Sequence, residues 1–136
     1  MNLKSFLEQS SFKLRQAGSD SPRLDAELLA QHVLGLSKID LLTKDQDIIP
    51  VPLRPKLQEL LVRRLDGEPV AYLTGKKEFF GFDFSVGDGV LVPRPETEYL
   101  VEEGLAAIQH IERALIADMG SGSGCVGLSI LLENKG

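Results

Sequence analysis

The chain has 136 residues, of which 43% are hydrophobic and 6% aromatic, proportions that exclude wholesale disorder and collagen-like repeats. Its net charge of −5 is uneven: residues 1–77 carry 12 basic and 10 acidic side chains (+2), whereas residues 78–136 carry 3 and 10 (−7). This acidity argues against direct nucleic-acid binding by the second half, because phosphates require clustered Lys and Arg.

Three absences in the sequence bear on the cellular setting. The longest apolar stretches fall far short of the ~20 residues that a membrane-spanning helix needs. The first residues include Lys4 and Glu8 and lack the apolar segment typical of a secretory signal. The one cysteine, Cys125, cannot form an internal disulfide. We therefore expect a cytoplasmic protein with no membrane contact.

The first 74 residues place apolar side chains at helical spacing. The strongest pattern is a leucine series at i, i+4, i+7, i+8 and i+12 from Leu53 to Leu65. Glycines or an Asp-Gly pair follow most of the periodic segments, as is typical of helix ends. The predicted helices cover residues 2–17, 22–34, 37–42, 53–65 and 69–73. Together they indicate a small helical bundle over residues 1–74.

After Gly75 the apolar period changes from 3.6 to 2. Phe80, Phe82, Phe84 and Val86 alternate with small or polar residues, which is the pattern of a half-buried strand. Turn-forming glycines interrupt the alternation, and residues 90–92 are a further candidate strand. We expect a β-hairpin linker over residues 75–93, with its phenylalanines mostly in the core.

The third segment, residues 94–136, combines a helix, a strand and a glycine loop. A helix is predicted from Pro95 to about Ile111, and the apolar run Ala114–Asp118 is predicted to be a buried strand. Gly120–Gly124 then forms a glycine-rich loop, and Cys125–Glu133 is predicted to be helical. The expected fold class is α+β: a helical bundle, a hairpin linker, and the start of a Rossmann-like domain comprising its first strand and flanking helices.

A strand, a glycine loop and a helix in succession form a ligand site. Glycines allow a ligand to approach the backbone, and a helix N-terminus offers free N–H groups and a positive dipole end. A phosphate-binding P-loop is excluded, because no Gly-Lys-Ser/Thr follows. The dinucleotide pattern fits Gly122, Gly124 and Gly127 by spacing, but a dinucleotide-dependent oxidoreductase is disfavoured because the loop begins at Gly120. The alternative that these residues form a glycine-rich turn that binds no ligand stays open at this point.

The order Asp118-x-Gly120-x-Gly122-x-Gly124 resembles the first motif of class I S-adenosylmethionine-dependent methyltransferases. The whole chain resembles the N-terminal half of the HemK (PrmC) family, the release-factor glutamine N5-methyltransferases. The most specific match is Pro93–Glu98, read as Pro-Arg-Pro-Glu-Thr-Glu, beside this glycine loop. The other matching segments are Leu24–Leu29, Arg63-Arg64, Gly67–Gly75, Glu78–Gly81, Phe84-x-Val86, Val90–Val92 and Asp118–Cys125.

The resemblance implies a function and a site. The family transfers a methyl group from S-adenosyl-L-methionine to the side-chain nitrogen of the glutamine in the Gly-Gly-Gln loop of peptide chain release factors, in translation termination. It implies a substrate-recognition role for residues 1–74, and it implies that residues 94–136 are a truncated beginning of the methyltransferase domain. The implied cofactor-binding residues are Gly120, Ser121, Gly122, Ser123 and Gly124. We expect a monomer whose partner is the release factor, with no metal site.

The family's catalytic Asn-Pro-Pro-Tyr motif does not occur in these 136 residues, whose asparagines are Asn2 and Asn134. We therefore expect no catalytic residue in this part and no methyl transfer by it alone. The lone predicted strand would also lack ladder partners, so we expect Met1–Leu73 to fold well as a bundle and the part after Pro93 to be poorly determined or aggregation-prone in isolation. Two alternatives stay open: another class I methyltransferase, acting on nucleic-acid adenine, and a non-catalytic helical binding module.

Overall fold

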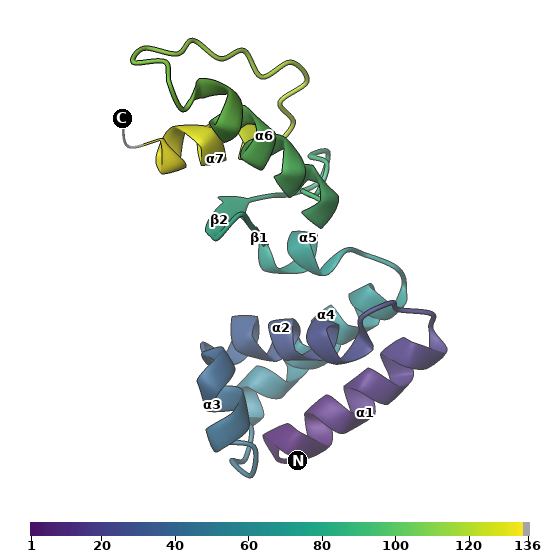
Figure 1. The fold of residues 1–136 in the computed structure, drawn as a ribbon. Helices are drawn as coiled ribbons and strands as arrows, with labels where there is room; N and C mark the ends of the chain where they lie inside the picture. The colour runs from purple at the N-terminus through teal and green to yellow at the C-terminus, as the bar shows by residue number, and fades with distance from the viewer. Residues whose placement is uncertain (135–136) are drawn as a thin grey trace. The chain divides into compact units, whose positions relative to one another are not determined.

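The computed structural model describes residues 1–134, which fold into two compact units divided between Thr74 and Gly75 (Figure 1). The first unit is entirely helical, and the second combines helices with a two-stranded sheet. The fold is therefore a mixture of helices and a small sheet, in agreement with the α+β part of the predicted fold class. None of the helices in the described part of the chain is long and apolar enough to cross a membrane.

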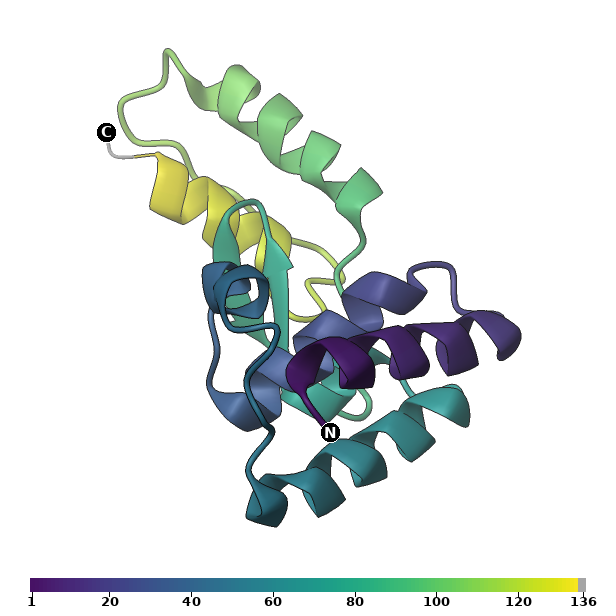
Figure 2. The same ribbon diagram turned by 90° about the horizontal axis from the view of Figure 1, so that it is seen from below.

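The first unit is a bundle in which α1, α2 and α4 pack against one another, and Figure 2 shows them from below. Its helices are α1 (Leu3–Gln16), α2 (Pro22–Leu34), α3 (Lys38–Thr43), the 3-10 turn η1 (Val51–Leu53), α4 (Arg54–Leu65) and α5 (Val70–Thr74). These bounds confirm the five predicted helices to within one or two residues. The main core contains ten buried residues: Leu3, Phe6, Leu7, Leu14, Ala26, Ala30, Leu41, Ile49, Leu57 and Leu61.

The helix ends follow from their flanking residues. The Asn2 side chain accepts a hydrogen bond from the Ser5 N–H at 2.9 Å, which caps α1. Ser37 and Asp40 form a reciprocal capping box at the start of α3. Gly35 ends α2 with a left-handed φ of 66°, a conformation that costs a glycine little. Local chemistry therefore sets where these helices begin and end.

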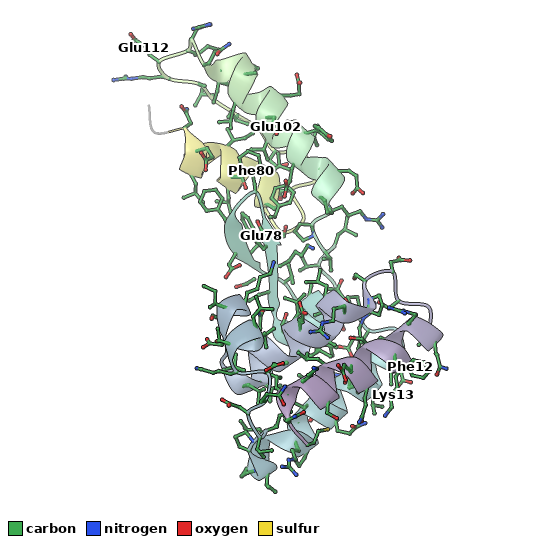
Figure 3. All side chains as sticks on the ribbon, turned by 60° about the horizontal axis from the view of Figure 1, so that its bottom comes forward. Phe12, Lys13, Glu78, Phe80, Glu102 and Glu112 are labelled. Carbon is green, nitrogen blue, oxygen red and sulfur yellow. The ribbon has the colours of Figure 1, made fainter. Side chains whose placement is uncertain are left out.

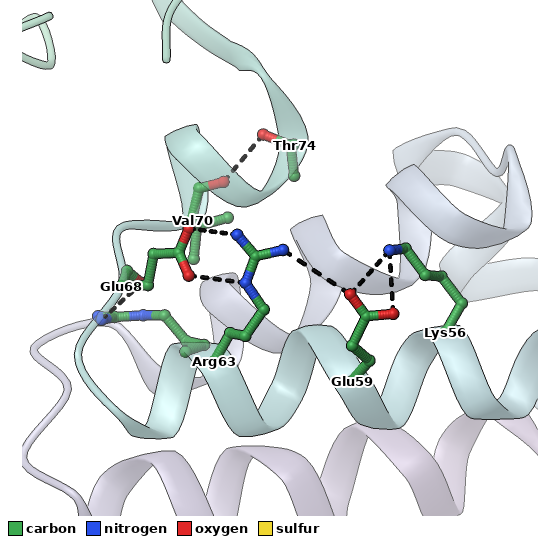
Figure 4. Close-up of polar contacts among 7 residues, drawn as sticks. Lys56, Glu59, Arg63, Glu68, Val70 and Thr74 are labelled. Atoms are coloured by element: carbon green, nitrogen blue, oxygen red, sulfur yellow. Dashed lines mark hydrogen bonds and ion pairs between the residues drawn. The ribbon is translucent and has the colours of Figure 1, made fainter. Parts of the chain in front are cut away.

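Charged side chains form a chain of contacts along the exposed face of α4 and into the following turn (Figure 4). Lys56 pairs with Glu59 at 2.9 Å, and the Arg63 Nε donates to Glu68 at 2.7 Å. The hydrogen bond from Arg63 holds the pKa of Glu68 below its ordinary value of 4.5. In α3, hydrogen bonds from Lys44 and then Ser37 hold the pKa of Asp40 well below its usual range.

We expect the first unit to lose stability as the pH falls. A carboxyl whose pKa is lowered by folding contributes stability above its unfolded pKa, and this contribution disappears as the pH falls toward the folded value. The free energy of unfolding should therefore decrease from about pH 5 downward. Urea titrations at a series of pH values measure this slope. The double variant Asp40→Asn/Glu68→Gln should have a shallower slope, and an unchanged slope would contradict the assignment.

The second unit begins with an antiparallel hairpin, followed by two helices. Strands β1 (Lys76–Phe79) and β2 (Phe82–Ser85) pair in the register Lys76 with Ser85 and Phe79 with Phe82. The 3-10 turn η2 (Pro95–Thr97) leads into α6 (Glu98–Ile108), which packs on α7 (Cys125–Glu133). Hairpin and helices share a core whose buried members are Phe79, Phe84, Val101, Cys125 and Ile130.

The predicted strand over Ala114–Asp118 is wrong. In the described residues the only sheet is the β1–β2 pair, and residues 109–124 form a long irregular connection between α6 and α7 (Figure 1). Leu115 is fully exposed and Ile116 is 49% exposed, so the run is not buried either. A parallel strand needs a hydrogen-bonded neighbour, and no other strand of the described chain lies beside this run. The candidate strand over residues 90–92 is wrong for the same reason.

Candidate functional site

The predicted glycine loop is a curled and largely exposed segment. Gly120, Gly122 and Gly124 have φ angles of 75°, 56° and 76°, so every second residue adopts the left-handed conformation that side chains disfavour. The Gly124 N–H donates to the Ser121 carbonyl at 2.7 Å, which closes a turn within the loop. The segment is therefore neither buried beneath side chains nor an extended continuation of the residues before it.

The loop ends at the N-terminus of α7, where backbone donors are available. Gly124 is the N-cap, and its carbonyl accepts the first helical bond from the Leu128 N–H at 2.9 Å. No side chain of the described residues caps the first amides of the helix, those of Cys125 and Val126. Two adjacent N–H groups at the positive end of a helix dipole are suited to binding an anionic group.

Asp118 connects the beginning of the loop to this helix. Its Oδ2 accepts a hydrogen bond from the Gly127 N–H at 3.1 Å, across nine residues of chain. A β-carbon at Gly127 would lie 3.1 Å from the same oxygen, so the absence of a side chain allows the close approach. A carboxylate at this point also provides a negative charge that can pair with a cationic group. The loop therefore presents N–H donors and a carboxylate within one turn of α7.

A pocket of about 410 Å³ opens beside these groups. Its lining combines Asp118, Ser121, Gly124 and Gly127 with apolar residues that include Ile116 and Leu128. A concave surface that combines a carboxylate and polar loop groups with apolar side chains suits a small ligand with a zwitterionic end and an apolar body. Sequence reasoning found the loop but not these apolar side chains, because Ile116 was assigned to a buried strand.

The five predicted loop residues and Cys125 differ in their exposure to solvent. Gly120, Ser121 and Gly122 are exposed and Ser123 and Gly124 are half-buried, so the five loop residues are accessible to different degrees. Cys125 is buried in the core of the second unit, where it packs with apolar side chains. Within residues 1–134, no group of three or more potential ligand side chains could hold a metal ion.

Comparison with known proteins extends these observations. The family model described as "PrmC N-terminal domain" matches residues 5–75. Three curated relatives are each named release factor glutamine methyltransferase. That of Nitratidesulfovibrio vulgaris is 40% identical over 131 residues, covering 96% of this chain and 44% of the relative. That of Vibrio cholerae is 39% identical over 133 residues, covering 98% and 46%. That of Coxiella burnetii is 45% identical over 115 residues, covering 85% and 42%. The chain thus spans less than half the length of the relatives it matches.

Proposed function

The chain belongs to the PrmC N-terminal domain family, and from this premise we propose that it is the N-terminal part of a release-factor glutamine methyltransferase. The reaction would transfer a methyl group from S-adenosylmethionine to the glutamine side chain of the Gly-Gly-Gln loop in a peptide chain release factor. The observation that carries the proposal is about 40% identity to relatives of that name over nearly the whole chain.

Each part of the chain takes a role in this proposal. The helical unit Met1–Thr74 would recognise the release factor, and the hairpin that follows would link it to the catalytic domain. Residues 94–136 would begin a Rossmann-like domain that holds the cofactor. The protein would act in the cytoplasm, where its substrate is made, and we expect it to be a monomer.

The glycine loop fits the amino-acid end of S-adenosylmethionine. No heavy atom lies within 4 Å of a β-carbon built at Gly120 or Gly122, so the loop borders open space that a ligand can enter. The amides of Cys125 and Val126 would bind the carboxylate of the cofactor, and Asp118 would face its ammonium group. Bound there, the cofactor supplies an electrophilic methyl group on a sulfonium centre.

These 136 residues would not perform the reaction by themselves. An amide nitrogen is a poor nucleophile because its lone pair is delocalised into the carbonyl, so the enzyme must orient it and stabilise its developing charge. The resemblance assigns that task to an Asn-Pro-Pro-Tyr motif, which is not present in this chain. We expect the isolated chain to produce no methylated release factor in an assay with radioactive cofactor.

A chimeric enzyme tests the function directly. Residues 1–134 of this chain would replace the matching part of the Nitratidesulfovibrio vulgaris relative, and we expect the chimera to methylate a release factor. In that chimera, Gly122→Val should raise the cofactor KM at least about tenfold, because a branched side chain would occupy the space beside the glycine loop where the cofactor would bind. Gly89→Val is the matched control, because Gly89 has a similar positive φ of 83° and equally open surroundings but lies outside the loop. An inactive wild-type chimera, or equal effects of the two variants, would count against the proposal.

A further inference from the structure

We propose that Glu98 is a positioning residue: its carboxylate fixes the hairpin turn and, through the core of the second unit, the start of α7 where the glycine loop ends. The part of this inference that concerns cofactor affinity rests on the proposed function. The part that concerns the turn and the helix does not.

The hairpin turn has an unfavourable sequence for its shape. Phe80 and Gly81 form a two-residue connection between β1 and β2, with φ angles of 52° and 77°. Positive φ at both positions defines a type I′ turn, which favours asparagine followed by glycine. Phe80 is the only residue other than glycine with positive φ in the described chain. A bulky side chain in this conformation persists only where surrounding contacts hold it.

Two carboxylates provide such contacts, and Figure 3 labels Phe80 and one of them, Glu78. The Gly81 N–H donates to Glu78 Oε1 at 2.8 Å, a local bond to a residue of β1. The Phe80 N–H donates to Glu98 Oε1 at 3.0 Å, across 18 residues of chain. Glu98 is the first residue of α6, so this bond joins the turn to the helix. Glu98 therefore connects two elements, whereas Glu78 acts only within the hairpin.

The residues beside the turn belong to the same core cluster as the beginning of α7. Phe79, next to Phe80, is 1% exposed and lies edge-to-face with Phe84, their ring centroids 6.1 Å apart. Val101 of α6 and Cys125 of α7 belong to the same core cluster. Cys125 directly follows Gly124, the last residue of the glycine loop and the N-cap of α7. The turn and the start of α7 thus border one shared core, through which a change in the turn would reach the loop.

Neighbouring carboxylates provide the matched control. Glu98 and Glu102 line the same hollow at the start of α6, and both lie on that helix. Glu102 is exposed, and within the described residues it makes no hydrogen bond. Replacing Glu102 therefore removes the same charge from the same surface without touching the turn.

Amide hydrogen exchange on the 136-residue chain tests the positioning role. In Glu98→Ala, we expect exchange to accelerate at least tenfold at the Phe80 amide and at the hydrogen-bonded amides of Gly127 and Leu128. Glu98→Gln should retain wild-type exchange at all three, because its amide oxygen still accepts the bond, and Glu102→Ala should also match wild type. Acceleration at Phe80 without acceleration at Gly127 and Leu128 would overturn the inference, as would wild-type exchange at Phe80.

Kinetics of the chimeric enzyme test the consequence for the cofactor. We expect Glu98→Ala to raise the cofactor KM at least fivefold with less than a twofold change in kcat, and Glu98→Gln to restore the KM. In a Phe80→Gly background, where the turn needs no support, Glu98→Ala should have a smaller effect. A wild-type KM for Glu98→Ala in an active chimera would overturn the coupling to the cofactor. A wild-type chimera without activity would count against the proposed function instead, and the exchange measurements would still decide the role of Glu98.

Discussion

Replacing Asp25 with alanine is expected to lower the free energy of unfolding of the first unit by about 3 kcal/mol, the lower end of the range for breaking a buried ion pair. Asp25 lies in the first turn of α2 and is 5% exposed. Its Oδ2 accepts hydrogen bonds from the Arg64 Nε at 2.8 Å and the Ser19 hydroxyl at 2.7 Å. The Ser21 hydroxyl donates to the other carboxylate oxygen at 3.2 Å.

The cost of this substitution arises from the groups left behind. Without the carboxylate, the Arg64 guanidinium and two hydroxyls lose their acceptor in a site closed to most water, and unsatisfied buried groups are more expensive than the net gain of a typical bond. Arg64 keeps 20% of its side chain exposed, so water can replace part of the lost contact, and the expected loss of stability lies at the lower end of the range. The carboxylate also joins the start of α2 to the end of α4, 39 residues later, so its loss loosens two helices.

Urea unfolding followed by circular dichroism measures the effect, with Glu27→Ala as the control. Glu27 is also on α2 and pairs with Arg23, but Arg23 is 52% exposed and the pair spans one helical turn. Such surface pairs contribute about 0.3–0.5 kcal/mol. A change below about 0.5 kcal/mol for Asp25→Ala, similar to that of Glu27→Ala, would show that the buried network does not stabilise the unit.

The sequence predicted the helices and the hairpin, because these elements are determined by residues that lie close together in the chain. The leucine series of α4 and the capping residue Ser37 act within a few residues of the helices they determine. The alternation around Phe82 likewise predicted the hairpin, whose two strands adjoin each other in the chain. Gly120, Gly122 and Gly124 were predicted to form a loop, and their left-handed angles agree with the composition.

The features that the sequence did not reveal depend on distant partners. An apolar run such as Ala114–Asp118 specifies a strand only when another strand lies beside it, and the run itself carries no information about that neighbour. The match over Pro93–Glu98 includes Glu98 and not Glu102, but it does not indicate the bond that Glu98 accepts from the Phe80 N–H, 18 residues away. The hydrogen bond from the Gly127 N–H to Asp118 could not be predicted either, because it depends on the conformation of the loop between the two residues.

Replacing Phe79 with alanine is expected to destabilise the second unit by about 3–5 kcal/mol, the usual cost of truncating a buried aromatic residue. Folded domains have stabilities of about 0.05–0.15 kcal/mol per residue, so the second unit, Gly75–Gly136, has a total stability of about 3–9 kcal/mol, and this substitution would remove much or all of it. The Phe79 ring is 1% exposed and belongs to a cluster with only five buried members, which leaves few contacts to compensate. We therefore expect α6 and α7 to lose most of their ordered structure.

Hydrogen exchange resolved by residue measures this loss in the intact chain. Amides such as those of Leu128 and Asn134, which bond within α7 and at its end, should exchange nearly unprotected in Phe79→Ala. Protection in α1, α2 and α4 should persist, because the core partners of Phe79 all lie between residues 79 and 130. Phe12→Ala provides the control for removing a phenylalanine, since Phe12 is 61% exposed on α1. If α7 keeps wild-type protection in Phe79→Ala, the shared core does not hold the hairpin and the glycine-loop helix together, and the route from Glu98 to the loop loses its physical basis.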